Sequence, residues 1–198
     1  RCFDWSLELG CVGCIECAEN EYNDQSNATT CKECLAGQYH DQTGQMTSAS
    51  CKFCEMGKYY AYGSCKQCEL GKYNDQQSVK TDANLTIPVI SCKECSMGTY
   101  NNQWQQSSCK VCGKGKFNDR TGQTYEGSCY DCGKGKFNDQ TSQISESSCK
   151  KCGKGRFNNL LGLTSEFNCK ECGKGKYNTL MGQSSETTCK ECVPGRYN

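Results

Sequence analysis

The chain has 198 residues, of which 22 are Cys, and its formal net charge is +1. Its mean hydropathy is −0.80, so it is too polar to bury a conventional apolar core, and disulfides must replace that core. Disulfides persist in oxidising compartments, which predicts a secreted or cell-surface protein. The absence of an 18-residue apolar run excludes a membrane span in this chain, and the start at Arg1 predicts that a leader has been removed.

Two segments break the pattern of the remaining chain. Residues 1–16 form a predicted N-terminal strand-like cap, because apolar and polar residues alternate over residues 3–9. A second apolar run lies in the longest loop between cysteines. Both segments either cover neighbouring repeats or form subunit contacts by strand addition. The apolar residues are Phe3, Trp5, Leu7 and Leu9 in the first segment, and Leu85, Ile87, Val89 and Ile90 in the second.

Ten Cys-x-x-Cys pairs follow one another along the chain. We call the second Cys of each pair the opening Cys, and the first Cys of the next pair its closing Cys. Residues 17–108 contain cysteine-rich repeats of irregular length, and residues 109–198 contain regular 20-residue repeats, the last of them incomplete. A fixed period predicts a small unit that stacks many times on its neighbours.

Charge differs between these two parts. Residues 1–108 carry 8 basic and 13 acidic residues, whereas residues 109–198 carry 15 and 9, a balance of −5 against +6. Opposite charge at the two ends favours head-to-tail contact between copies, although drift between repeats would also produce the difference.

Each repeat begins with the same turn. The residue three past the opening Cys, the turn position, is Gly in nine of ten copies and Asn20 in the other, which predicts a left-handed backbone conformation. An aromatic residue stands five past every opening Cys, and Asn follows it in eight copies. Loops of variable length with constant ends predict short, irregular β-hairpins of at most two strands, with little or no helix. The predicted architecture is an elongated rod of about ten such units.

The phrase Cys-x-x-Gly-x-Tyr, one long gap and Cys-x-x-Cys resembles the ephrin-receptor-like cysteine-rich repeat. It is also similar to growth-factor-receptor-type repeats and to one submodule of tumour-necrosis-factor-receptor ectodomains. In that family the opening Cys bridges to the closing Cys. The resemblance therefore implies Cys17–Cys31, Cys34–Cys51, Cys54–Cys65, Cys68–Cys92, Cys95–Cys109, Cys112–Cys129, Cys132–Cys149, Cys152–Cys169 and Cys172–Cys189.

Four cysteines are left over. Cys14 stands at a closing position, and Cys2 is its most natural partner. Cys192 opens a repeat that the sequence does not close, so either the natural protein continues or another subunit closes it, and Cys11 is then the odd thiol. Zinc sites built from pairs of Cys-x-x-Cys are the main alternative to disulfides, but the uniform gaps argue against them.

Catalysis has little support in this sequence. His40 is the only His, and it replaces the Asn of other repeats, which predicts a solvated turn residue. No cofactor is indicated. Recurrent Asp residues after the Asn position are interpreted as turn formers rather than calcium ligands. A stripe of Lys and Arg in the regular repeats could bind an acidic glycan, but nucleic acid is not expected outside a cell.

Two sequons, at Asn27 and Asn84, predict N-linked glycan in loops.

These features favour a non-enzymatic extracellular structural protein, either a spacer or the subunit of a surface filament. Its expected partners are further copies of itself or other surface proteins. The alternatives are the ectodomain stalk of a receptor or adhesin that binds a protein or glycan, and a zinc-binding repeat protein.

Overall fold

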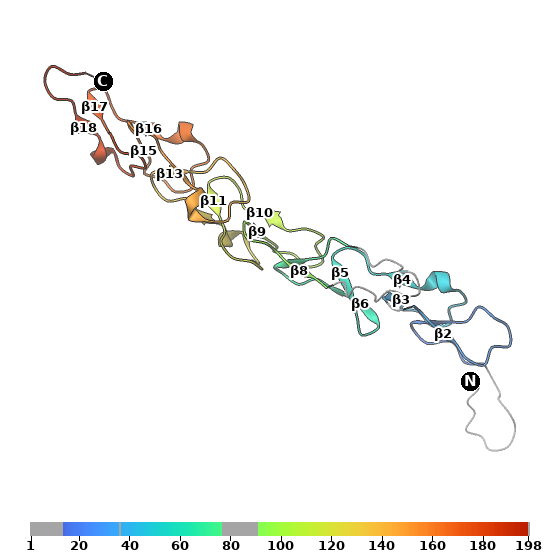
Figure 1. Ribbon diagram of the computed structural model, residues 1–198. Coiled ribbons are helices and arrows are strands. Elements are labelled where there is room, and N and C mark those ends of the chain that lie inside the picture. Colours follow the sequence, from blue (N-terminus) through green and yellow to red (C-terminus); the bar gives the residue numbers. More distant parts are fainter. Residues whose placement is uncertain (1–13, 36, 77–90, 198) are drawn as a thin grey trace. The chain divides into compact units, whose positions relative to one another are not determined.

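The computed structural model describes residues 14–35, 37–76 and 91–197, and short antiparallel hairpins follow one another along them (Figure 1). Within these residues there are nine two-stranded sheets, each formed by consecutive strands. The strands are β1 Glu21–Tyr22, β2 Lys32–Glu33, β3 Gln38–Tyr39, β4 Lys52–Phe53, β5 Lys58–Ala61, β6 Ser64–Gln67, β7 Lys72–Tyr73, β8 Lys93–Glu94, β9 Thr99–Tyr100, β10 Lys110–Val111, β11 Lys116–Phe117, β12 Tyr130–Asp131, β13 Lys136–Phe137, β14 Lys150–Lys151, β15 Arg156–Phe157, β16 Lys170–Glu171, β17 Lys176–Tyr177 and β18 Lys190–Glu191.

No α-helix occurs in the described residues; the helical elements there are single 3-10 turns. They are η1 Ser48–Ser50, η2 Glu126–Ser128, η3 Glu146–Ser148, η4 Glu166–Asn168 and η5 Glu186–Thr188. Each turn ends one residue before a closing Cys and so leads the chain back to its disulfide. The predicted fold class, small disulfide-rich repeats made of short hairpins with little helix, is confirmed.

The repeated sequence phrase sets the geometry of each hairpin. The Gly at the turn position has a positive φ in every repeat, for example +78° at Gly115, and Asn20 has φ +66°. The turn directs the next two residues into the first strand, which pairs with the two residues after the closing Cys. In β11 and β12, for example, Lys116 lies opposite Asp131, and Phe117 lies opposite Tyr130.

Nine disulfides close the repeats, and they join the same pairs that the resemblance implies. Each closes a loop of 11 to 24 residues. A loop of about 15 residues stabilises the fold by about 3 kcal/mol in the chain-entropy model. Cys14 and Cys192 are free. The predicted partner of Cys14, Cys2, lies outside the described residues, as does Cys11.

Sulfur forms most of the buried apolar interior. Of the buried apolar residues that the structure describes, all but Tyr100, Phe137 and Phe157 are half-cystines. Tyr100 packs with Cys112 and Cys129, which form the disulfide of the following repeat, and Phe137 packs with Cys152 and Cys169 in the same way. The aromatic ring of one repeat therefore contacts the disulfide of the next.

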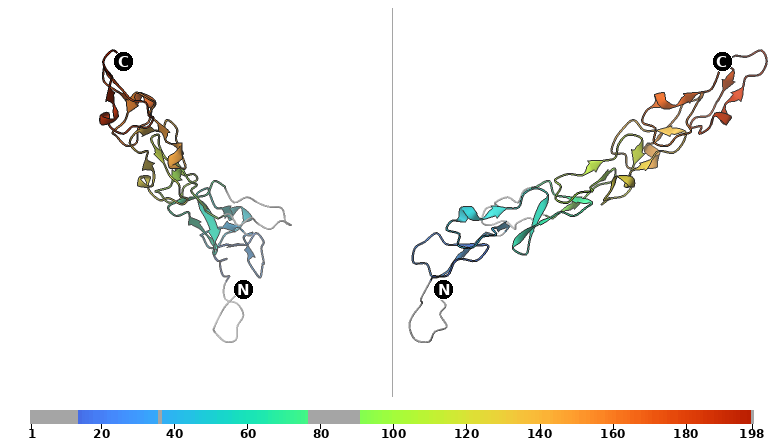
Figure 2. Two further views of the ribbon diagram at one scale, coloured as in Figure 1. Left: turned by 60° about the vertical axis from the view of Figure 1, so that its left-hand side comes forward. Right: turned by 180° about the vertical axis from the view of Figure 1, so that it is seen from behind.

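The chain divides into two compact units. Unit 1 comprises Arg1–Glu69, Asn74–Lys93 and Trp104–Ser107, and unit 2 comprises Leu70–Tyr73, Glu94–Gln103 and Ser108–Asn198. Within unit 2, the hairpins from β9 to β18 follow one another in sequence order (Figure 2). Among the described residues, no helix is long and apolar enough to cross a membrane.

Candidate interaction surfaces

A repeated set of hydrogen bonds links each repeat to the next. Between the repeats opened by Cys95 and Cys112, the Gly98 N–H donates to the Asn118 carbonyl at 2.8 Å, and the Cys112 N–H donates to the Gly98 carbonyl at 2.9 Å. The Asn118 side chain donates from Nδ2 to the Thr99 carbonyl at 3.0 Å. Its Oδ1 accepts the Arg120 N–H at 3.0 Å, which fixes the amide orientation.

The Asn residue at this contact is buried throughout the stack. The members, all 8% exposed or less, are Asn74, Asn101, Asn118, Asn138, Asn158 and Asn178. The Nδ2 of Asn74, Asn101, Asn118 and Asn158 donates to a carbonyl of the preceding repeat, so a shift between those repeats would leave polar groups unpaired. The Nδ2 of Asn138 and that of Asn178 have no partner among the described residues. This role of the Asn between repeats was not predicted from the sequence, because the partner carbonyl lies in another repeat.

The prediction that His40 is a solvated turn residue is wrong, because its side chain is buried, at 5% exposed. It occupies the Asn position of its repeat, and its Nε2 lies 3.0 Å from the Glu21 carbonyl, the group that the Asn amide contacts in other repeats. Its main chain also exchanges hydrogen bonds with Asn20 of the preceding repeat. The imidazole is buried because it replaces the Asn amide as the donor between repeats.

The sulfur atoms of Cys34 and Cys51 lie within 4.8 Å of each other and of a ring nitrogen of His40, a grouping typical of a metal site. The two sulfurs form a disulfide, however, so neither offers a thiolate to a metal. The same argument holds for all eighteen bridged cysteines. The alternative of four-cysteine zinc sites is therefore wrong for the repeats that the structure describes.

The turn Gly also meets a repeat two places further along. A Cβ added to Gly115 would lie 2.2 Å from the Gly162 carbonyl oxygen, and one added to Gly98 would lie 2.4 Å from the Ser142 carbonyl oxygen. A side chain is excluded here by this close approach as well as by the positive φ. At Gly155, Gly175 and Gly195, by contrast, the same Cβ would meet no described atom within 4 Å.

The carbonyl that approaches the turn Gly belongs to a second left-handed position, which was not predicted from the sequence. Its members, four residues past the Asn position, are Asn27, Gly44, Gln105, Gly122, Ser142, Gly162 and Gly182, all with a positive φ. The N–H of Gly162 donates to the Cys132 carbonyl of the preceding repeat at 2.9 Å, and Gly44, Gln105, Gly122, Ser142 and Gly182 make the equivalent bond. The recurrence of Gly at this place in the regular repeats was the signal that could have found it.

Charged side chains pair across single hairpins. The Lys150 ammonium donates to the Asp139 carboxylate at 2.8 Å, and these hydrogen bonds hold the pKa of Asp139 below its usual value. Lys32 lowers the pKa of Asp24 in the same way, and Lys93 that of Asp75. In these three repeats the Asp therefore pairs with the Lys that follows the closing Cys. Within the predicted basic stripe, Lys136 contacts Glu146 at 2.6 Å, so local ion pairs offset part of its charge.

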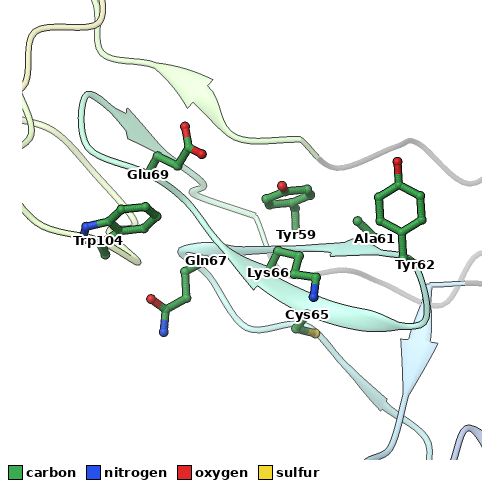
Figure 3. A pocket seen from close by; sticks show the side chains of 8 residues that line it. All are labelled: Tyr59, Ala61, Tyr62, Cys65, Lys66, Gln67, Glu69 and Trp104. Carbon is green, nitrogen blue, oxygen red and sulfur yellow. The ribbon is translucent and has the colours of Figure 1, made fainter.

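An aromatic groove lies on the longest hairpin of unit 1, formed by β5 and β6 (Figure 3). It is an open hollow of about 480 Å³ lined by Tyr59, Ala61, Tyr62, Cys65, Lys66, Gln67, Glu69 and Trp104. Tyr62 at the tip of the hairpin is 99% exposed, and Trp104 is 54% exposed. Ring faces beside an ammonium, an amide and a carboxylate can bind a ligand that has both apolar and polar sides.

Several predicted contact residues cannot be placed. Phe3, Trp5, Leu7, Leu9, Asn84, Leu85, Ile87, Val89 and Ile90 lie outside the described residues. Asn27, the other predicted glycan site, is exposed and has φ +62°. Exposure makes the Asn27 amide accessible to a glycosyl transferase, and the attachment of glycan to Asn27 stays a prediction.

Two neighbouring repeats match a known family in sequence. Residues 89–129 match the family model described as tyrosine-protein kinase ephrin type A/B receptor-like. These residues contain the two repeats opened by Cys95 and Cys112, which are thus similar to ephrin-receptor-like cysteine-rich repeats. Comparison with curated proteins finds no match. Such a repeat, within a stack of many disulfides, indicates a receptor-type extracellular region.

Proposed function

We propose that this chain is a non-catalytic structural protein of the extracellular space, in which stacked ephrin-receptor-like repeats act as a spacer or as the subunit of a surface filament. The observation that carries this proposal is the recurrent hydrogen bonding around the buried Asn. Buried polar groups of one repeat form hydrogen bonds with the neighbouring repeat, and the cysteines form the disulfides that close the loops. Such a stack is extended by adding repeats, as in other repeat proteins.

Duplicating one regular repeat tests the spacer function. The duplicated segment is 132–151, which carries an opening Cys, a closing Cys and the two residues of the returning strand. We expect the maximum dimension measured by small-angle X-ray scattering to rise by a fixed increment with each added copy. The control inserts a Gly/Ser segment of equal length after Thr141, and it should add disorder without that fixed increment. A variant with extra repeats but unchanged dimension would contradict the spacer function.

A second candidate function is a receptor or adhesin stalk that binds a ligand in the aromatic groove. The exposure of Tyr62 and Trp104, whose rings line the same groove, supports it. A sugar ring fits this chemistry, because it has an apolar face and a rim of hydroxyl groups. A glycan array probed with the intact chain and with Trp104→Ala is the test; Tyr125→Ala, an exposed aromatic in unit 2, is the matched control. Equal binding by all three proteins, or none, would count against this function.

A further inference from the structure

In one regular repeat, two Lys residues from successive repeats act on the same carboxylate. The Asp139 carboxylate accepts two hydrogen bonds from the Lys150 ammonium, at 2.8 and 3.0 Å. These bonds hold the pKa of Asp139 below its usual value, and the charge of Lys114 in the preceding repeat lowers that pKa further. Lys114 is near because the N–H of the next residue, Gly115, donates to the Asn138 carbonyl at 2.8 Å.

The following repeat keeps this arrangement but lacks the carboxylate. Asn159 stands where Asp139 stands one repeat earlier. The hairpin register places Lys170 where Lys150 lies, and the same hydrogen bond between repeats, at 2.8 Å, brings the turn that contains Lys134 to Asn159. Lys134 and Lys170 are exposed, and neither forms an ion pair within the part of the chain that the structure describes. We call these two Lys residues the first cationic site.

The repeat opened by Cys172 has lost the carboxylate as well. Thr179 stands at the Asp position, Lys190 follows the closing Cys, and the hydrogen bond between repeats, at 2.9 Å, brings the turn that contains Lys154 to Thr179. Lys154 and Lys190 are exposed and have no ion-pair partner among the described residues. We call these two Lys residues the second cationic site.

Positive charge at these sites is not neutralised by the neighbouring hairpin. Glu171, the residue after Lys170, forms its ion pair with Arg156 at 2.9 Å instead. Residues 109–198 as a whole carry 15 basic and 9 acidic residues. Exposed cations without counterions concentrate anions from the solution, so each site is arranged to accept an anionic group from outside the chain.

The placement of the two sites favours a polymeric ligand over a membrane. Leu160 and Leu161, both exposed beside Asn159, could contact lipid. However, η4 and η5, which lead into the strands that begin with Lys170 and Lys190, lie on opposite sides of the stack (Figure 1, Figure 2). A flat bilayer cannot contact both sides at once, whereas a flexible polyanion can lie across the stack. One exposed ion pair contributes little, but a chain that occupies both sites gains from its high effective concentration at the second.

We propose that the first and second cationic sites bind the anionic groups of an acidic polysaccharide, which take the place that the Asp139 carboxylate fills in the earlier repeat. The inference goes beyond the proposed spacer function, because it names a ligand for the regular repeats. It is also independent of the aromatic groove, which lies in unit 1.

Restoring the missing carboxylates tests the two sites. Heparin, which carries sulfate and carboxylate groups, is the probe, and its Kd for the intact chain is measured by surface plasmon resonance. The double variant Asn159→Asp/Thr179→Asp should raise that Kd by about two- to fivefold for each carboxylate, because an internal anion then occupies the Lys pair. The matched control, Thr164→Asp/Ser184→Asp, adds the same charge at exposed positions of the same two repeats and should raise the Kd less.

A gain of binding is the second test. Asp139→Asn frees Lys114 and Lys150, so it should create a third site and lower the heparin Kd by about two- to fivefold. An unchanged Kd in this variant, equal effects of the two double variants, or no binding by the intact chain would each overturn the inference. Tighter binding to phosphatidylserine vesicles than to heparin would overturn the choice of a polysaccharide. The repeat-duplication experiment decides the spacer function separately in each of these cases.

Discussion

The contact between repeats depends on the shape and bonding capacity of a single amide. Asn offers two donors and an acceptor on a short side chain, so it can reach the preceding repeat while its Oδ1 holds its own loop two residues on. A larger apolar residue could fill the space but would leave the carbonyl of residue 99 and the N–H of residue 120 without partners. A buried group without a partner is costly, and this cost favours Asn at this contact.

Asn118→Ala should therefore lower the local stability between the repeats opened by Cys95 and Cys112. Loss of the amide leaves a part-buried donor and a part-buried acceptor unpaired, so we expect a reduction of about 1–3 kcal/mol. Hydrogen exchange of the Gly98 amide, which bonds to the Asn118 carbonyl, measures the local opening free energy. Asn118→His should lose less than Ala, because His40 makes the equivalent contact. Asn159→Ala, at an exposed neighbour, is the control; an equal effect there would contradict the assignment.

Sequence reasoning reached the residue types but not all of their roles. The turn Gly residues were predicted correctly, because a positive φ has a direct signature in the exchange of Gly for Asn20. The interrepeat role of Asn and the burial of His40 were missed, because the partner carbonyl lies in another repeat and no local pattern identifies it. His40 was nevertheless informative, since it stands where Asn stands elsewhere and is an alternative donor.

At the scale of the hairpin, the turn Gly meets two separate constraints. The first is local, since φ near +75° is costly for any residue with a Cβ. The second is the close approach of a carbonyl from two repeats further on, which only the three-dimensional stack reveals. The sequence predicted the hairpins and the turns because both depend on residues within one period. Contacts between repeats two places apart have no such local signal.

The two constraints separate in a pair of substitutions. Gly115→Ala and Gly155→Ala introduce the same methyl group at φ +78° and +75°, so both should lose about 1–2 kcal/mol for the left-handed conformation. Gly115→Ala also places its Cβ 2.2 Å from the Gly162 carbonyl oxygen, whereas Gly155→Ala meets no described atom within 4 Å. We expect Gly115→Ala to lose a further amount of about 1–3 kcal/mol, because the repeats must move apart. Urea unfolding with the disulfides intact compares the two; equal losses would show that the close approach costs little.

For the whole molecule, disulfides take the place of an apolar core. The buried apolar residues that the structure describes are almost all half-cystines. Of the three buried aromatic rings, those of Tyr100 and Phe137 pack against a disulfide. Full reduction should therefore abolish the compact units. We expect small-angle scattering to show an expanded chain, and amide exchange to lose its protection. A reduced chain that stays compact would contradict the view that sulfur bridges hold the repeats together.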